Sequence, residues 1–282
     1  MIHSNSTQKQ ISLKDFKLLV FDIDGTLVGP NHILDPYTRD ILLKLRDYGI
    51  HITLATGKNL PATQQIADDL EIDLPLVLSN GSIIETRFGK ITTKSVLPFD
   101  VTKRVIEICE ERNCNLVIYI DNDILMKEMN DDIYPIYNQV TYGIVEVGTW
   151  EPIKDRFAEV NKCLVIEQHY PQNLVNLEKK FKEEIGDRSD IIFTSTKLLE
   201  VLPKGITKVT GIQTLIDSLG VKMNEVMAFG DYDNDIEMLN AAGLSVVVEN
   251  GSIAAKASAD LIIGSCDQNG PAKFLENLME SL

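Results

Sequence analysis

A short apolar run that ends in two aspartates constrains this chain more than any other feature. Residues 18–27 read LLVFDIDGTL, so Asp22 and Asp24 directly follow a stretch expected to be a buried strand. Burial of an ionised carboxylate costs several kcal/mol unless an opposite charge and hydrogen bonds compensate it. The fold therefore has to bring a partner to the end of this strand.

The composition is typical of a globular protein with a sizeable core. The chain has 282 residues, of which 44% are hydrophobic, which suffices for one large domain or two smaller ones. The formal net charge of −15 disfavours nucleic-acid binding, because phosphate backbones are bound by clustered Lys and Arg. No apolar run approaches the ~18 residues of a membrane span. Neither nucleic acid nor a membrane is an expected partner.

The cysteines and the N-terminal segment favour a cytoplasmic location. The four cysteines lack CxxC spacing or a nearby His, which predicts reduced and mostly buried thiols: Cys109, Cys114, Cys163 and Cys266. Residues 1–12 are polar at their start, lack the apolar core of a signal peptide and are expected to form a loose tail.

The order of expected elements indicates an α/β protein. Strands at 18–23, 50–54 and 75–78 alternate with helices at 36–48 and 61–70. The same pattern resumes near the C-terminus, with strands at 198–202, 226–229 and 244–248 and helices at 207–219, 233–242 and from 271. Such alternation predicts a parallel sheet with right-handed crossovers.

The middle of the chain follows a different pattern. A hairpin is expected at 82–86 and 91–95, followed by helices at 100–112 and 171–185 and strands at 116–120 and 163–167. We therefore predict a doubly wound, Rossmann-like core domain built from residues 13–84 and 197–282. An α+β domain, residues 85–196, is inserted into it.

Four polar clusters are expected at one edge of the parallel sheet. Ligands of open parallel sheets bind beyond the carboxyl ends of the strands. The clusters at such ends are Asp22 with Asp24; Thr56, Gly57 and Lys58; Asp231, Asn234 and Asp235; and Lys208, which opens a helix.

These residue types predict metal-assisted phosphate chemistry. Two carboxylates ~4 Å apart repel by about 4 kcal/mol at an effective dielectric constant near ~20, and a hard cation removes that cost. Mg²⁺ prefers carboxylates, waters and phosphate oxygens, whereas zinc prefers His and Cys, which these clusters lack. Thr56, Gly57 and Lys208 offer phosphate-binding groups. One carboxylate can then act as nucleophile and the other as acid and base.

The clusters belong to four motifs that resemble those of the haloacid dehalogenase-like superfamily. The first is DIDGTL at 22–27, and the second is LATGK at 54–58. The segment PKGITKVTG at 203–211 resembles the third and puts its lysine at Lys208 rather than Lys204, and GDYDND at 230–235 matches the fourth, GDxxND. LSNG at 78–81 and the insertion after it resemble the Cof-type branch, which carries a large α/β cap. The resemblance extends from about Phe16 to the end.

This resemblance implies a Mg²⁺-dependent phosphatase of small phosphorylated metabolites, such as sugar phosphates. It implies that Asp22 is the nucleophile, forming an aspartyl-phosphate, and that Asp24 is the general acid and base. The implied metal ligands are Asp22, Asp231, the Asp24 backbone carbonyl and, through water, Asp235. The implied phosphoryl-binding groups are Thr56, Gly57, Lys208, Asn234 and the backbone N–H of Ile23.

Two alternatives stay open at this point. Phosphomannomutases of the eukaryotic type resemble this layout, and a mutase would form an isomer without net phosphate release. A phospho-receiver or Mg²⁺-binding regulatory module is also an acidic α/β protein, although receivers are shorter and lack GDxxND. Asp24 argues against dehalogenase activity, since that branch lacks this acid.

Several residues depart from the motifs or lack a motif. Lys58 stands where the branch usually has Arg, and it either contacts substrate or is a solvated lysine at a helix start, which we favour. Asn250 either helps to order Asp231 or Lys208 or is a turn residue. The four histidines have no motif context and are assigned to surface or structure. The substrate and the oligomeric state are not predicted.

Overall fold

Five parallel strands form the sheet that carries the expected site. A computed structural model gives the structure of residues 11–279. The strand order is β14-β13-β12-β1-β2. The strands are β1 (Leu18–Phe21), β2 (His51–Leu54), β12 (Val226–Gly230), β13 (Leu244–Val248) and β14 (Leu261–Ile263). All neighbouring pairs in this sheet are parallel.

The strand order places a crevice beside β1. From β1 the chain proceeds to β2 on one side, and it later returns to β12 on the other. A point where the order reverses in this way leaves room for a ligand at the carboxyl ends of the strands. Asp22 follows β1 and Asp231 follows β12, so the two motifs meet at this point.

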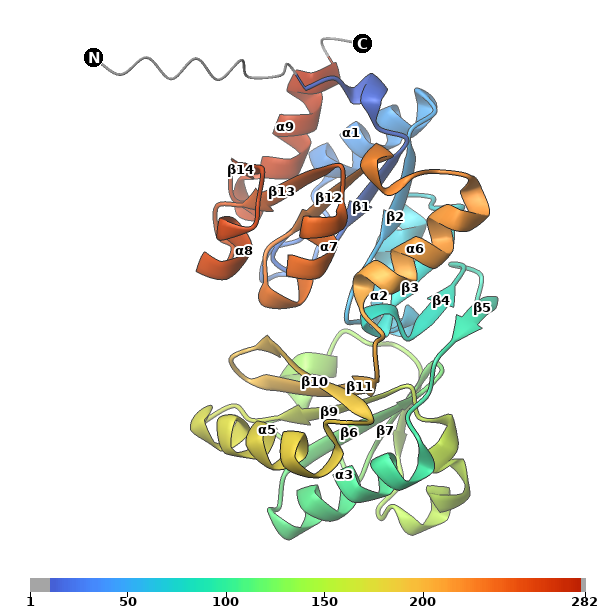
Figure 1. Ribbon diagram of the computed structural model, residues 1–282, viewed down its shortest axis with the longest axis vertical. Coiled ribbons are helices and arrows are strands. Elements are labelled where there is room, and N and C mark those ends of the chain that lie inside the picture. Colours follow the sequence, from blue (N-terminus) through green and yellow to red (C-terminus); the bar gives the residue numbers. More distant parts are fainter. Residues whose placement is uncertain (1–10, 280–282) are drawn as a thin grey trace, which may run out of the picture.

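Helices cover both faces of the sheet (Figure 1). One face packs against α1 (Pro36–Asp47), α2 (Leu60–Asp69) and α9 (Gly270–Met279). The opposite face packs against α6 (Lys208–Leu219), α7 (Ile236–Ala241) and α8 (Ile253–Ala257). The predicted doubly wound α/β fold is confirmed.

Local sequence signals explain the ends of these helices. Asp35 caps α1 by accepting a hydrogen bond from the Tyr37 backbone N–H at 2.9 Å, and Gly49 after it has a φ of 86°. Helix α6 ends at Gly220, whose φ of 65° is left-handed. Glycine tolerates this conformation best, which is why it terminates helices.

A small antiparallel sheet extends this part of the molecule. It consists of β3 (Leu76–Leu78), β4 (Ile83–Glu85) and β5 (Ile91–Lys94). Strand β3 bridges to Ala55 through Val77, and Ile91 packs against the hydrophobic core. The predicted hairpin is confirmed, and it packs with the parallel sheet. Residues 11–94 and 208–279 are called the core lobe below.

A six-stranded sheet forms the second lobe, in the order β10-β11-β9-β6-β7-β8. The strands are β6 (Asn115–Ile120), β7 (Asp123–Met126), β8 (Ile144–Glu146), β9 (Lys162–Ile166), β10 (Ser189–Ser195) and β11 (Leu198–Pro203). Helices α3 (Phe99–Glu111) and α5 (Gln172–Ile185) pack on one face. Residues 99–203 are called the cap lobe below.

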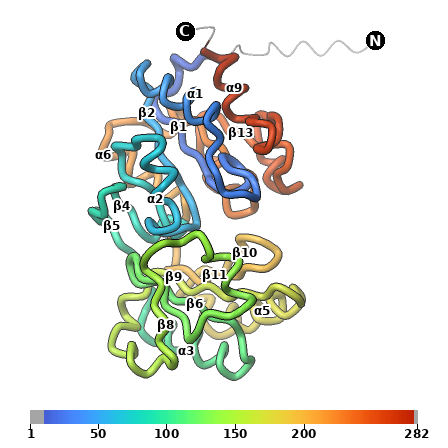
Figure 2. The backbone as a smooth tube through the Cα atoms, turned by 180° about the vertical axis from the view of Figure 1, so that it is seen from behind, coloured from blue at the N-terminus to red at the C-terminus, as the bar shows by residue number. Residues whose placement is uncertain are grey.

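The chain passes between the lobes twice, at residues 95–98 and 204–207. The two crossings run side by side at one edge of the molecule (Figures 1 and 2). Strand β11 pairs with β9 and β10, so residues 198–203 lie in the cap sheet, not with the core as expected. An apolar strand does not reveal its partner in the sequence. We propose that the lobes divide at these crossings rather than at 85 and 197.

The remaining elements are short. They are α4 (Tyr134–Tyr137) and 3₁₀ helices at Leu13–Asp15, Ser79–Gly81, Glu151–Glu159, Met223–Glu225, Asp233–Asp235 and Cys266–Gln268. The helix expected over 233–242 therefore begins as a 3₁₀ turn. Residues 1–10 of the expected tail lie outside the described residues, while Ile11 packs against the core.

Two further expectations concern the cysteines and the membrane. All four cysteines are free thiols; Cys109, Cys163 and Cys266 are buried and Cys114 is half-buried. Among residues 11–279, no helix combines the length and the apolar character needed to cross a membrane.

Candidate active site

Asp22 lies at the centre of the site, just beyond β1. Its backbone N–H donates to the Phe229 carbonyl at 2.9 Å, which continues the pairing of β1 with β12. Phe21 and Phe229 stack beneath it with ring centroids 4.4 Å apart. Carboxylate oxygens of Asp22, Asp231 and Asp235 all lie within 4.8 Å of one another. The sheet thus brings three acidic groups from two motifs together.

Lys208 bridges two of these carboxylates. Its Nζ donates to Asp22 Oδ1 and to Asp235 Oδ1, each at 2.6 Å. Burial alone would lower the pKa of Lys208, but Asp22 and Asp235 raise it above its ordinary value. The lysine is therefore held as a cation beside the predicted nucleophile. Lys204 instead pairs at 2.8 Å with Asp190 of β10 in the cap sheet.

Asp235 organises the loop after β12. Its Oδ2 accepts hydrogen bonds from the backbone N–H groups of Asp231, at 2.9 Å, and Tyr232, at 3.1 Å. Its Oδ1 accepts from Lys208. Both oxygens are thus already hydrogen-bonded, which fits the implied role of Asp235 as an indirect metal ligand.

Gly25 and Thr26 of the first motif hold the Asp231 carboxylate in position. Thr26 Oγ1 donates to Asp231 Oδ1 at 2.8 Å. Gly25 has a φ of +82°, and a Cβ at this position would overlap Asp231 Oδ2. Only glycine combines this backbone conformation with such a close approach.

The acidic cluster carries an excess of negative charge. Burial raises the pKa of Asp22 well above its usual range; Lys208 opposes this shift, while Asp235 and Asp231 add to it. Burial and the Asp235 carboxylate raise the pKa of Asp231 to about 7, against the hydrogen bond from Thr26. One lysine therefore does not neutralise the three carboxylates.

The cluster fits a magnesium ion. Among the described residues, Asp22 Oδ2 and Asp231 Oδ2 accept no hydrogen bond, so both are available as ligands. All donors in the cluster are hard oxygens, with no His or Cys, which suits Mg²⁺ rather than zinc. A divalent cation would also relieve the repulsion that raises the two pKa values.

Asp24 does not join this cluster through its carboxylate. Its Oδ1 lies 2.7 Å from Lys58 Nζ and 2.7 Å from His32 Nδ1. Burial would raise the pKa of Asp24, but the hydrogen bonds and charges of His32 and Lys58 lower it below its ordinary value. The carboxylate is 40% exposed, so it is accessible to solvent beside the buried nucleophile.

One sequence interpretation is corrected here, and two residues without a settled role gain partners. Lys58 is not a solvated lysine at a helix start, because it pairs with Asp24. His32, assigned to surface or structure, reaches the same carboxylate. Asn250 donates to the Gly25 carbonyl at 2.7 Å and accepts from the Cys266 N–H at 3.0 Å. It thus holds the loop after Asp24, not Asp231 or Lys208.

Of the predicted phosphoryl-binding side chains, Lys208 contacts Asp22 directly. Thr56 and Gly57 follow β2 after one intervening residue, and Thr56 Oγ1 accepts a hydrogen bond from the Lys58 N–H at 3.2 Å. Among residues 11–279, the backbone N–H groups of Ile23 and Gly57 donate to no acceptor. These free donors fit oxygens of a bound phosphoryl group. Asn234 Nδ2 donates to Asn80 Oδ1 at 3.1 Å.

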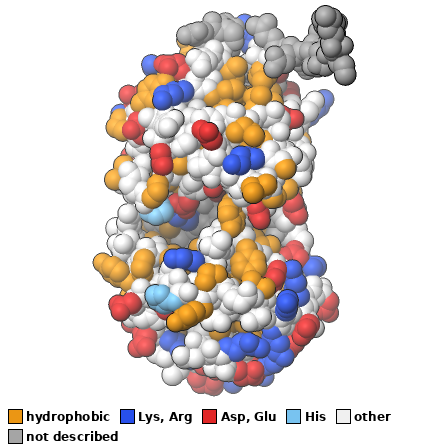
Figure 3. Space-filling view, turned by 90° about the vertical axis from the view of Figure 1, so that its left-hand side faces the viewer, with side chains coloured by type: hydrophobic (Ala, Val, Ile, Leu, Met, Phe, Trp, Pro, Cys, Tyr) orange, Lys and Arg blue, Asp and Glu red, His pale blue; other side chains and the backbone are white. Residues whose placement is uncertain are grey.

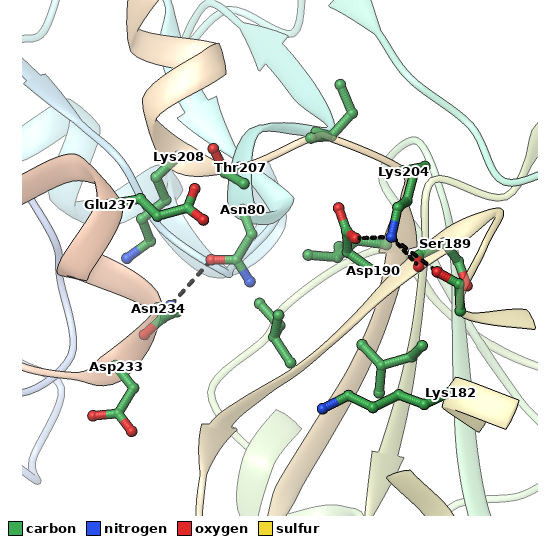
Figure 4. Close-up of a pocket in the computed structure, with 15 residues that line it drawn as sticks. Asn80, Lys182, Ser189, Asp190, Lys204, Thr207, Lys208, Asp233, Asn234 and Glu237 are labelled. Atoms are coloured by element: carbon green, nitrogen blue, oxygen red, sulfur yellow. Dashed lines mark hydrogen bonds and ion pairs between the residues drawn. The ribbon is translucent and has the colours of Figure 1, made fainter. Parts of the chain in front are cut away.

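A cavity of about 320 Å³ lies between the lobes next to Lys208 (Figure 4). Asn80, Lys208 and Asn234 line it from the core side, and Ile191 and Lys182 line it from the cap. The space-filling view shows the surface narrowing between the two lobes (Figure 3). The cavity is therefore bounded by both lobes and reaches Lys208, whereas the three carboxylates of the acidic cluster do not line it.

Comparison with known proteins decides the family. Residues 19–275 match the family of haloacid dehalogenase-like hydrolases. The chain belongs to this family. As a haloacid dehalogenase-like hydrolase, it is 29% identical to an HMP-PP phosphatase of Escherichia coli O6:H1, over 94% of this chain and 96% of that protein. It is 28% identical to an HMP-PP phosphatase of Citrobacter koseri, over the same shares.

Solved structures agree with this assignment. A haloacid dehalogenase-like hydrolase from Bacteroides thetaiotaomicron matches with a TM-score of 0.83 and 25% identity, covering 93% of this chain and 99% of that chain. The subclass IIB sugar phosphatase BT4131 matches with a TM-score of 0.80 and 26% identity, covering 93% and 98%. The resemblance read from the four motifs is confirmed.

Sequence reasoning missed the residues that connect the site to the cap. Asn80 entered the sequence analysis only as part of LSNG at 78–81, yet it is buried and contacts Asn234. Lys162 and Glu200 are charged residues inside apolar strands, KCLVI and LLEVLP. A buried charge in such a strand needs a partner, and that was the available signal.

Proposed function

We propose that this protein is a Mg²⁺-dependent phosphatase that hydrolyses small phosphorylated metabolites through an aspartyl-phosphate on Asp22. The main support is a single observation: the buried Asp22 carboxylate lies beside the Lys208 cation and within 4.8 Å of Asp231. Membership of the hydrolase family and the phosphatases among the relatives support the same chemistry.

In the first step a carboxylate oxygen of Asp22 attacks phosphorus, and the bond from phosphorus to the leaving-group oxygen breaks. Lys208, Thr56 and the free N–H groups of Ile23 and Gly57 bind the phosphoryl oxygens. Asp24 protonates the departing alkoxide, so that an alcohol leaves. When bound to Asp22 and Asp231, with the Asp24 carbonyl and Asp235 in support, Mg²⁺ supplies positive charge to this site.

In the second step water hydrolyses the aspartyl-phosphate. Asp24 takes a proton from the water, whose oxygen bonds to phosphorus and releases the Asp22 carboxylate. The lowered pKa of Asp24, due to His32 and Lys58, favours its ionised form and so suits this role as base. The net reaction converts a phosphate monoester and water into an alcohol and inorganic phosphate.

The cavity between the lobes is the proposed place for the leaving group. The relatives act on different compounds, as the names HMP-PP phosphatase and sugar phosphatase state. Identities of 29% and 26% support the class of small phosphorylated metabolites and not one compound within it. The expected cytoplasmic location stays a prediction.

The test is phosphate release from p-nitrophenyl phosphate, with and without Mg²⁺, by the wild type and Asp22→Asn. We expect Mg²⁺-dependent release that EDTA abolishes and that falls at least about 1000-fold in the variant, because the amide is not a nucleophile. Equal release by the variant would refute the role of Asp22. Isomer formation from a sugar phosphate without phosphate release would instead support the mutase alternative.

A further inference from the structure

A buried ion pair of the cap sheet touches the proposed phosphate-binding loops. Lys162 on β9 and Glu200 on β11 are 2% and 3% exposed, and Lys162 Nζ lies 3.0 Å from Glu200 Oε1. A buried ion pair rarely adds net stability over apolar residues of similar volume. Its contacts therefore indicate what else the pair does.

The pair lies on the face of the cap sheet that is turned away from α3 and α5. Glu200 pairs in register with Leu164, two residues from Lys162, so both charges share one face. Leu164 and Ile166 of that face belong to a different hydrophobic cluster from Cys163 and Val165, which pack toward the helices. The charged face thus looks toward the core lobe.

Lys162 reaches across to the core lobe. Its Nζ donates to the Gly57 carbonyl at 2.6 Å and lies 4.3 Å from the centre of the Tyr119 ring. Burial would lower the pKa of Lys162, but Glu200 raises it above its ordinary value. The ammonium group therefore stays charged, and one of its hydrogen bonds joins the two lobes.

The contact with Gly57 fixes the loop that follows β2. The carbonyl of Gly57 and the N–H of Lys58 belong to one peptide unit, and that N–H donates to Thr56 Oγ1. Both ends of the peptide unit are thus held, one from the cap and one from the loop itself. Thr56 and Gly57 are proposed phosphoryl-binding residues.

Glu200 reaches the core lobe through its other oxygen. Its Oε2 accepts a hydrogen bond from Asn80 Nδ2 at 2.7 Å, and Asn80 is 1% exposed with a left-handed φ of 53°. Asn80 Oδ1 in turn accepts from Asn234 Nδ2. Figure 4 shows the two asparagines facing each other at the edge of the cavity.

The carboxylate determines how both amides are oriented. An ionised Glu200 only accepts hydrogen bonds, so the NH₂ group of Asn80 has to face it. The Asn80 oxygen then faces Asn234, which has to present its own NH₂ group on that side. Asn234 thereby keeps its second N–H available as a donor, which a phosphoryl oxygen requires.

We propose that Lys162, Glu200 and Asn80 are positioning residues through which the cap orients Gly57 and Asn234 for phosphate binding. This inference rests on the proposed function of the same site. The phosphate-binding loops acquire their final geometry only when the cap is seated on the core. A merely structural ion pair would instead affect stability and leave the activity of the folded enzyme unchanged.

The experiment compares wild type, Asn80→Ala, Glu200→Gln, the double variant and the control Glu184→Gln. Glu200→Gln keeps the shape but adds an NH₂ donor, and Asn80→Ala breaks the chain of amides while leaving the ion pair intact. Glu184 pairs with Arg104 within the cap, so the control removes an ion pair of the same lobe. The readouts are thermal unfolding, kcat and KM for p-nitrophenyl phosphate with Mg²⁺, and calorimetric affinity for inorganic phosphate.

We expect each single variant to lower kcat/KM by about 10- to 100-fold in folded protein, because small displacements of positioning groups cost this much. The kcat/KM of the double variant should equal that of the less active single variant, since both residues act through one chain of contacts. The control should retain wild-type values. Wild-type kcat/KM in folded single variants, or effects that multiply in the double variant, would overturn the proposal.

Phosphate affinity separates this inference from the proposed function. If the wild type hydrolyses no monoester, the proposed phosphatase is wrong, and phosphate affinity then decides the inference. Weaker phosphate binding by Asn80→Ala and Glu200→Gln, with an unchanged control, supports it. Equal affinity in all proteins, or no binding by the wild type, overturns it. If Glu200→Gln does not fold, Asn80→Ala alone decides in the same way.

Discussion

Lys208 of the core lobe and Lys162 of the cap lobe are equally buried, each 2% exposed, yet their surroundings carry different charge. Lys162 faces one carboxylate, that of Glu200, so the pair is neutral. Lys208 bonds to Asp22 and Asp235, and Asp231 stands beside them. The charge of the Lys162 pair is balanced within the protein, whereas the negative charge around Lys208 is not.

This difference distinguishes a positioning contact from a ligand site. A neutral buried pair needs nothing further, and its hydrogen bonds can hold neighbouring loops. A cluster with excess negative charge has raised pKa values and gains from a bound cation. The excess charge of the acidic cluster therefore favours the binding of a metal ion. The neutral pair in the cap lacks this excess, and its hydrogen bonds hold neighbouring loops in place.

The largest expected contrast is between Lys208→Met and Lys162→Met. Lys208→Met should lower phosphate release at least about 1000-fold, because the proposed mechanism uses Lys208 to bind the transferring phosphoryl group. Lys162→Met leaves Glu200 buried without its cation and should lower the free energy of unfolding by about 3 to 5 kcal/mol. Its folded fraction should lose only about 10- to 100-fold in activity. Equal losses of activity for the two variants in steady-state assays would contradict the distinction between a ligand site at Lys208 and a positioning contact at Lys162.

Gly25→Ala tests whether the space beside Asp231 matters for the metal. The new Cβ would overlap Asp231 Oδ2, whereas Gly220→Ala, also at positive φ, meets nothing within 4 Å. Both variants should lose about 1 to 3 kcal/mol of stability from the backbone conformation. Only Gly25→Ala should also weaken Mg²⁺ affinity, by about tenfold or more, in calorimetric titrations. Unchanged affinity in folded Gly25→Ala would contradict the assignment of Asp231 as a ligand.

The pH dependence of stability tests the excess charge directly. The pKa of Asp231 rises from 3.8 to about 7 on folding, so the folded state binds this proton more tightly. The stabilisation is fully present below pH 3.8 and is lost as the pH rises through about 7. In EDTA the unfolding temperature should therefore fall by a few degrees as the pH rises from 3.8 to about 7, the interval between the two pKa values.

Added Mg²⁺ should reverse most of that fall, and more strongly at pH 8 than at pH 5, because protons compete with the metal for the carboxylates. Asp231→Asn is the control in which the dependence on pH should flatten. A Mg²⁺ effect of equal size at both pH values would speak against the charged cluster as the binding site.

The smallest expected effect concerns Lys58→Ala. Lys58 helps to lower the pKa of Asp24, so its removal should raise that pKa. The acidic limb of the pH profile of kcat should move to higher pH, with a loss of less than about tenfold at neutral pH. His32→Ala should act in the same direction, since His32 contacts the same oxygen. A shift to lower pH would rule out this account of Asp24.

Much of the site was predictable because a parallel sheet aligns its carboxyl ends. Asp22 and Asp231 end neighbouring strands, and Lys208 opens a helix after a recognisable strand. Their spacing in the sequence could therefore be translated into proximity. The partners of Asp24 could not be predicted, because they depend on where the side chains of His32 and Lys58 extend from their loops.

The sequence by itself determined the alternating pattern, the four motifs and the carboxylates that need a cation. The tertiary structure decided which sheet receives β11 and which cap residues contact the loops that we propose bind phosphate. Lys162 and Gly57 are 105 positions apart, and Asn80 and Glu200 are 120 apart. Such pairs meet only because the cap packs on the core, and that packing depends on the summed surfaces of both lobes rather than on any local pattern.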